Sequence, residues 1–169
     1  AYIFMKIKKE KSAGFCFGVK RAISLVEEQI KKNNGTQIYT YGPIIHNESV
    51  VNALAEKGVQ VMGENDDPSS YTKGTVILRS HGVSKKVQDA IEAAGHATID
   101  ATCPFVKKIH NLAREASEKG EYIIIIGDPE HPEIQGITGW IEGNDYTVIK
   151  TPGEADNFSL NNNEKKILI

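Results

Sequence analysis

The chain has 169 residues, of which 40% are hydrophobic and 25% are charged, and these values are ordinary for a globular protein of one compact domain or two small ones. The formal net charge of −2 gives no overall electrostatic reason to expect nucleic-acid binding. No apolar run reaches the roughly 18 residues that a membrane helix needs, and the N-terminus lacks the apolar core of a secretory signal. We therefore predict a cytoplasmic protein without nucleic-acid or membrane partners.

Strand and helix patterns alternate through the first part of the chain. In chain order they predict a helix around Val19–Ile30, a strand at Ile38–Tyr41, a short helix around Val50–Leu54, strands at Val59–Met62 and Thr75–Leu78, a helix around Val83–Ile91 and a strand at Ala97–Asp100. The polar stretch Gly63–Lys73 predicts a loop.

The second part of the chain continues the pattern. Pro104 opens a helix that ends at Gly120, since proline is tolerated at the first helical position. The all-apolar run Tyr122–Ile126 predicts a strand buried on both faces of a parallel sheet. Further strands are predicted at Tyr146–Ile149 and Lys166–Ile169.

Alternating strands and helices predict an α/β fold of repeated βα units with mostly parallel sheets. We expect an N-terminal segment at residues 1–13, a first α/β domain at 14–102 and a second at 103–169. The apolar run that ends at Ile169 has no cap or tail after it, so we expect the second domain to be incomplete and the chain to be truncated.

The chemically informative residues share one kind of position in the predicted fold. Each lies just after a predicted strand or just before a predicted helix, and in open α/β sheets ligands bind beyond the carboxyl ends of the strands. The sequence therefore predicts one site formed by Cys16, His46, His81, Cys103, His131 and Glu133.

The residue types indicate the ligand. Helix N-termini offer free N–H groups and partial positive charge, and imidazoles add hydrogen-bond donors, so a phosphate or diphosphate group is a natural ligand. The same field favours thiolates, which bind soft metals and iron–sulfur clusters. The two cysteines, Cys16 and Cys103, are too few for a secreted disulfide framework.

Each residue also has a purely structural interpretation. A single cysteine is often an inert small hydrophobe, a single histidine often caps a helix, and Glu133 could simply favour a helix dipole. Arg79 is interpreted as a solvated or pairing charge, although it is close enough to His81 to touch an anion. His96 and His110 are interpreted as structural. The joint placement of the six candidates, rather than any one of them, favours a site.

Five segments carry the candidate residues, namely Ser12–Ala22, Tyr41–Asn47, Arg79–Val83, Asp100–Pro104 and His131–Glu133. In order and spacing they resemble the motifs of the 4-hydroxy-3-methylbut-2-enyl diphosphate reductases, the IspH or LytB family. The resemblance covers nearly the whole chain. It implies two of the three similar α/β domains of a trefoil-like fold.

The resemblance also implies a reaction, in which the substrate hydroxyl is removed with two electrons and two protons in the last step of the non-mevalonate isoprenoid pathway. Cys16 and Cys103 would be two of three ligands of a [4Fe–4S] cluster. His46, His81 and His131 would bind the diphosphate, with His131 also delivering protons, and Glu133 would be the acid. Ferredoxin or flavodoxin would donate the electrons.

One departure is that the family's third cluster cysteine lies further along, in a third domain, and this chain has no third cysteine. We therefore expect a truncated form of the reductase that self-associates through exposed surface. The alternatives are a non-catalytic diphosphate-binding fragment without a cluster, a zinc site at Cys16, Cys103 and one or two histidines, and a disulfide between the two cysteines.

Overall fold

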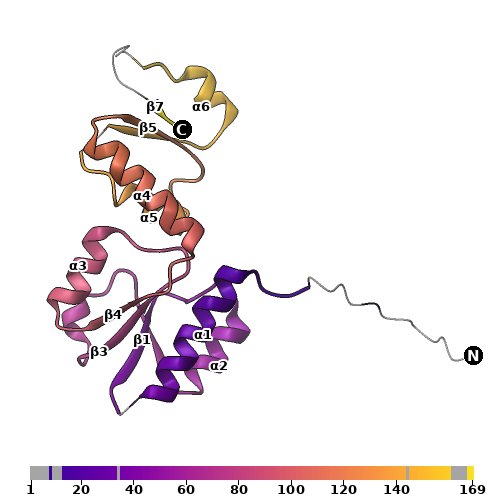
Figure 1. Ribbon diagram of the computed structural model, residues 1–169, viewed down its shortest axis with the longest axis vertical. Coiled ribbons are helices and arrows are strands. Elements are labelled where there is room, and N and C mark those ends of the chain that lie inside the picture. The colour runs from indigo at the N-terminus through magenta and orange to yellow at the C-terminus, as the bar shows by residue number, and fades with distance from the viewer. Residues whose placement is uncertain (1–7, 9–12, 34, 144, 161–166) are drawn as a thin grey trace, which may run out of the picture.

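The computed structural model describes residues 8, 13–33, 35–143, 145–160 and 167–169. Most of the predicted N-terminal segment and the first residue of the predicted strand Lys166–Ile169 therefore lie outside the described residues. The described chain forms two parallel sheets, each with its own helices, stacked along the long axis of the molecule (Figure 1). Among the described residues, no helix is long and apolar enough to cross a membrane.

The first sheet has the strand order β2-β1-β3-β4, and every neighbouring pair is parallel. Its strands are β1 (Gln37–Tyr41), β2 (Val59–Met62), β3 (Gly74–Leu78) and β4 (Ala97–Asp100). Helices α1 (Phe17–Lys32) and α2 (Glu48–Ala55) lie on one side of it and α3 (Lys85–Ala93) on the other (Figure 1). All of these elements are predicted by the sequence patterns.

Side chains alternate between the two faces of this sheet, as the pleat of a strand requires. Ile38 and Ile77 pack in one core with the buried side chains of α1 and α2. Tyr39 and Val76, each the neighbour of one of these, pack in a second core with Ile91 of α3. Burial on both faces explains the near-continuous apolar runs of β1 and β3.

The second sheet places β5 (Tyr122–Ile126) between β6 (Tyr146–Ile149) and β7 (Ile167–Leu168), again all parallel. Its helices are α4 (Pro104–Glu118), α5 (Pro132–Thr138) and α6 (Pro152–Asn157). Parallel sheets with interleaved helices confirm the predicted α/β class. The division into domains at residues 102 and 103 stays a prediction.

The structure corrects two details of the prediction. β5 is not buried on both faces, because Ile126 is 65% exposed and only Ile123 is buried: this small sheet leaves the carboxyl end of its central strand uncovered. The stretch Gly63–Lys73 is not wholly loop, since it contains the 3-10 turn η1 (Pro68–Ser70), which Asp67 caps by accepting a hydrogen bond from the Ser69 amide.

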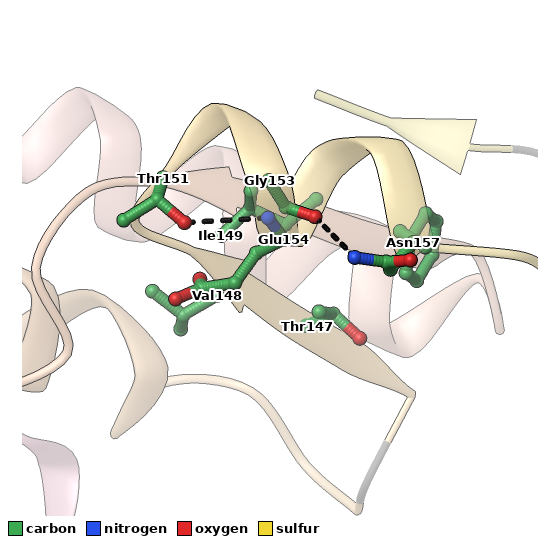
Figure 2. Close-up of a pocket in the computed structure, with 8 residues that line it drawn as sticks. Thr147, Val148, Ile149, Thr151, Gly153, Glu154 and Asn157 are labelled. Atoms are coloured by element: carbon green, nitrogen blue, oxygen red, sulfur yellow. Dashed lines mark hydrogen bonds between the residues drawn. The ribbon is translucent and has the colours of Figure 1, made fainter.

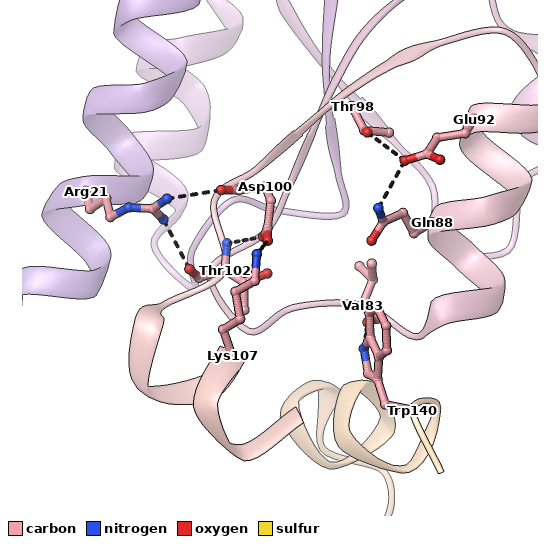
Figure 3. A network of polar contacts seen from close by, with 9 residues as sticks. All are labelled: Arg21, Val83, Gln88, Glu92, Thr98, Asp100, Thr102, Lys107 and Trp140. Atoms are coloured by element: carbon pink, nitrogen blue, oxygen red, sulfur yellow. Dashed lines mark hydrogen bonds and ion pairs between the residues drawn. The ribbon is translucent and has the colours of Figure 1, made fainter. Parts of the chain in front are cut away.

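The first sheet with its helices and the second sheet with its helices form two halves of the molecule. Contacts between these halves join the start of α3 to the end of α5. The Trp140 indole nitrogen donates a hydrogen bond of 2.9 Å to the Val83 carbonyl (Figure 3). The Lys85 amide donates to the Gly139 carbonyl at 3.3 Å. His110 of α4 stacks on Trp140, with ring centroids 6.0 Å apart, and is 5% exposed. The aromatic pair fills the space between the halves.

We expect the free energy of unfolding to decrease as the pH falls from 6.5 to 4, partly because of His110. Burial lowers the pKa of this histidine from 6.5 to about 4. Between pH 6.5 and 4 the unfolded chain therefore binds a proton at this histidine that the folded chain does not. The neutral His110 ring thus lowers the free energy of unfolding by about 2–3 kcal/mol as the pH falls through this range, and has no such effect above pH 6.5. Urea unfolding across this range checks it, because His110→Phe should show a flatter pH dependence; an identical dependence in the variant would contradict it.

Candidate functional site

The carboxyl ends of three parallel strands lie side by side in the first sheet. Tyr41 of β1 is in register with Leu78 of β3, which is in register with Asp100 of β4. The loops that follow these strands carry His46, His81 and Cys103 respectively. The sequence prediction that these residues share one edge is therefore what the topology shows.

Backbone hydrogen bonds tie the three loops together. The Ser80 amide donates to the Ile44 carbonyl at 3.2 Å, and the Cys103 amide donates to the Ser80 carbonyl at 2.9 Å. Each bond lies within two residues of a predicted site residue. The positions of His46, His81 and Cys103 relative to one another are therefore set by main-chain contacts.

Three histidines from the two sheets converge at this edge. The ring centroids of His46 and His81 are 4.6 Å apart, and those of His81 and His131 are 6.0 Å apart. His46 and His131 are exposed, whereas His81 is half-buried between them. Rings this close can contact one anion together, which is the arrangement that a phosphate or diphosphate group needs.

The electrostatics of His81 favour an anion. Burial, and then electrostatic interaction with His46, Arg79 and His131, lower the pKa of His81 to about 4, so its ring is neutral at neutral pH. Its Nδ1 atom is buried and has no hydrogen-bond partner among the described residues. A bound anion beside the ring would favour its protonated form, in which both ring nitrogens are hydrogen-bond donors.

His131 is the N-cap of α5 and lies two residues before Glu133. Its Nδ1 atom accepts a hydrogen bond of 3.2 Å from the Glu133 amide. In the neutral ring the proton is then on Nε2, which is left as a donor. Glu133 is half-buried in the first turn of the same helix. The two residues are thus held next to each other by the helix start.

Arg79, two residues before His81, is held in place by an ion pair and a backbone contact. Its side chain is only 5% exposed, its Nη1 atom forms an ion pair with Glu64, and its Nε atom donates to the Gly82 carbonyl at 3.4 Å. The interpretation of Arg79 as a pairing charge is therefore confirmed. Its expected proximity to an anion bound at His81 stays a prediction.

Glu64→Gln is expected to lower the free energy of unfolding by about 2–3 kcal/mol, because it leaves the buried Arg79 guanidinium without its counter-charge. Breaking the exposed pair of Glu27 and Lys57 with Glu27→Gln should cost less than about 1 kcal/mol. Urea unfolding of the two variants measures the difference. Equal losses would show that the Arg79 pair is no stronger than a surface pair.

The two cysteines are the N-caps of α1 and α4, and both are free thiols. Cys16 is exposed and Cys103 is partly buried. The start of α1 lies against Cys103, because a Cβ atom added to Gly18 would be 2.6 Å from the Cys103 Sγ atom. Only glycine permits this approach, and no sequence pattern indicated it.

A polar network fixes the turn before Cys103 (Figure 3). Arg21 of α1 donates to the Thr102 carbonyl at 3.1 Å and to the Asp100 carbonyl at 3.2 Å. Lys107 of α4 forms an ion pair with the Asp100 carboxylate, and hydrogen bonds from Lys107 and Thr102 hold the pKa of Asp100 below its usual range despite its burial. The two helices that carry the cysteines are therefore tied to the same turn.

The donor set of this chain fits an iron–sulfur cluster only in part. A four-iron cluster is held by three or four thiolates, and the chain has two. The described residues contain no group of three or more His, Cys, Asp or Glu side chains that could hold a metal ion. The alternative zinc site is not formed by these described residues, and a cluster would need ligands beyond the two thiols.

Two open hollows of similar size lie in different places. One, of about 610 Å³, lies between β6 and α6 and is lined by residues such as Thr147, Glu154 and Phe158, with no histidine or cysteine (Figure 2). The other, of about 590 Å³, is lined by His46 and Asn47 at the start of α2. We place the candidate site at the second because it adjoins the histidine cluster.

Comparison with known proteins gives one consistent result. The family model described as LytB protein matches residues 7–169. The chain is 46% identical over 154 residues to a 4-hydroxy-3-methylbut-2-enyl diphosphate reductase of Caldanaerobacter subterraneus subsp. tengcongensis, covering 91% of this chain and 53% of the relative. It is 41% identical over 165 residues to the Clostridioides difficile reductase, covering 98% and 58%.

Solved structures agree with the sequence relatives. The chain superposes on a structure of (E)-4-hydroxy-3-methyl-but-2-enyl diphosphate reductase with a TM-score of 0.75 and 37% identity, covering 87% of this chain and 52% of the other. For the Plasmodium falciparum reductase the TM-score is 0.81, with 30% identity and coverages of 93% and 48%. The chain spans about half the length of the curated relatives it matches.

Proposed function

Because this chain belongs to the LytB family, we propose that it carries part of the active site of a 4-hydroxy-3-methylbut-2-enyl diphosphate reductase of isoprenoid biosynthesis. The observation that supports this most directly is the convergence of His46, His81 and His131 from two separate sheets. The overall reaction takes up two electrons and two protons, breaks the C–O bond of the allylic alcohol and releases water. The products are isopentenyl and dimethylallyl diphosphate.

In this proposal the histidines bind the diphosphate of the substrate. His131 donates from Nε2, because its Nδ1 atom already accepts from the Glu133 amide. His81 has a buried Nδ1 atom without a partner, and its low pKa means that it can gain a proton when the diphosphate binds. Binding of the diphosphate would fix the reacting end of the substrate near the cysteine-bearing helix starts.

Glu133 is the proposed proton donor to the leaving hydroxyl. It shares the first turn of α5 with His131, so the acid and a diphosphate-binding residue are positioned by one helix. Cys16 and Cys103 would provide two ligands of an iron–sulfur cluster, which supplies the electrons when bound. A small redox protein such as ferredoxin or flavodoxin is the proposed electron donor.

The second candidate function is a diphosphate-binding fragment without redox chemistry. The presence of only two thiols favours it, since two are fewer than a cluster needs.

Anaerobic reconstitution with iron and sulfide distinguishes the two functions. Iron and sulfide are counted per chain, and reduction of the hydroxylated diphosphate is assayed with a reduced viologen. A stoichiometric four-iron cluster with turnover would support the reductase and show that the thiols of this chain suffice. No cluster and no turnover, with the diphosphate still bound, would support the fragment. Failure to bind the diphosphate would contradict both.

A further inference from the structure

His110 lies in the seam between the two halves of the molecule, outside every motif considered above. It is 5% exposed and stacks on Trp140, with an angle of 28° between the ring planes. Its Nε2 atom is buried and has no hydrogen-bond partner among the described residues. The Nε2 atom therefore makes no hydrogen bond, and the ring acts in the seam through its volume and its flat face.

The ring touches two of the three chain segments that carry the histidine cluster, those of His81 and His131. A Cβ atom added to Gly82, which follows His81, would lie 2.4 Å from the His110 Cε1 atom. A Cβ atom added to Gly136 of α5 would lie 3.2 Å from the His110 Nε2 atom and 3.3 Å from the His81 carbonyl oxygen. His110 is therefore packed between the turn that carries His81 and the helix that begins with His131.

We propose that His110 is a positioning residue, whose ring sets the spacing between the His81 turn and α5 and so holds His81 and His131 together in the anion site. The inference rests on the proposed diphosphate binding for its functional consequence. The positioning itself does not depend on diphosphate binding, because the spacing of the His81 and His131 rings exists in the free protein. Removal of the ring opens a cavity into which both segments can move.

His96 offers a matched control at the other end of the same sheet. It is also 5% exposed, and it accepts from the Gly74 amide at 3.2 Å through Nδ1 and contacts the Pro68 carbonyl at 2.9 Å through Nε2. Gly74 begins β3, whereas the His81 turn follows its end. Loss of His96 should therefore destabilise the protein without moving the cluster.

The test uses the full chain and compares His110→Ala, His110→Phe and His96→Ala. Imidazole ¹H–¹⁵N correlation spectra report the His81 and His131 rings, and calorimetry with inorganic pyrophosphate reports binding. His110→Ala is expected to shift both ring signals and to weaken pyrophosphate binding at least about tenfold. His110→Phe, which keeps an aromatic ring against Trp140, should remain within about threefold of the unmodified chain. His96→Ala should leave signals and affinity unchanged.

Unchanged ring signals in His110→Ala would overturn the inference, as would equal shifts in His96→Ala. If His110→Ala fails to fold, the comparison moves to His110→Leu, which keeps much of the side-chain volume but loses the flat ring against Trp140 and should still shift the His81 and His131 signals. Unshifted signals there would also overturn the inference. If the unmodified chain does not bind pyrophosphate, the proposed function fails, yet the ring signals still decide the positioning role.

Discussion

Replacement of His81 by alanine is expected to weaken pyrophosphate binding by about tenfold to a hundredfold, because it removes a hydrogen bond to a charged group worth about 1.5–3 kcal/mol. His81 is the central ring of the cluster, within 4.6 Å of His46 and 6.0 Å of His131. It is also the only one of the three with a buried ring nitrogen that lacks a partner among the described residues. No other single substitution in the cluster should weaken binding as much.

The same variant should lose little stability, and this separates binding from folding. A buried nitrogen without a partner costs free energy in the folded state, so its removal offsets much of the lost packing. Calorimetry with pyrophosphate and urea unfolding measure the two quantities on one preparation. His96→Ala is the control, with the opposite expectation of lower stability and unchanged affinity. Affinity within about twofold of the unmodified chain in His81→Ala would remove this residue from the site.

The second large effect is expected for Gly82→Ala, which should lower the free energy of unfolding by about 3 kcal/mol. Gly82 has a φ of 77°, in the left-handed region that favours glycine. An added Cβ atom would in addition lie 2.4 Å from His110 Cε1 and 3.1 Å from Thr102 Cγ2. Backbone strain and overpacking therefore act together at this position.

Gly120→Ala separates the two causes. Gly120 has a φ of 70°, but an added Cβ atom there would meet nothing within 4 Å. It should cost about 1 kcal/mol from the backbone alone. In a chain that also carries His110→Ala, the cost of Gly82→Ala should fall towards that of Gly120→Ala, because the closest contact is gone and only the contact with Thr102 Cγ2 remains. If Gly82→Ala and Gly120→Ala cost the same in the unmodified chain, the packing contribution does not exist.

The strands of the first sheet and the location of the site could be predicted because both follow from local sequence patterns. Each histidine of the cluster comes soon after an apolar strand, and parallel strands place their carboxyl ends at one edge. Helix starts were predictable where a capping residue precedes apolar spacing. Asn47 and Ser84, residue types that favour the N-cap, accept hydrogen bonds from the Val50 and Val87 amides.

The residues that hold the site in place could not be predicted in the same way. The contacts of Gly18 with Cys103, of Arg79 with Glu64 and of His110 with Gly82 join segments that are distant along the chain. No local pattern records such pairs. Helices α5 and α6 were not predicted because their seven and six residues are too few to show a helical period.

The central claim is that His46, His81 and His131 form one diphosphate site, and a pyrophosphate titration followed by imidazole ¹H–¹⁵N spectra tests it most directly. We expect the signals of all three rings to move together with a single dissociation constant, while the signals of His96 remain fixed. The His81 signal should also show proton uptake, because a bound anion raises the pKa of that ring from about 4. Rings that respond independently, or a His81 signal that does not move at saturation, would contradict the account.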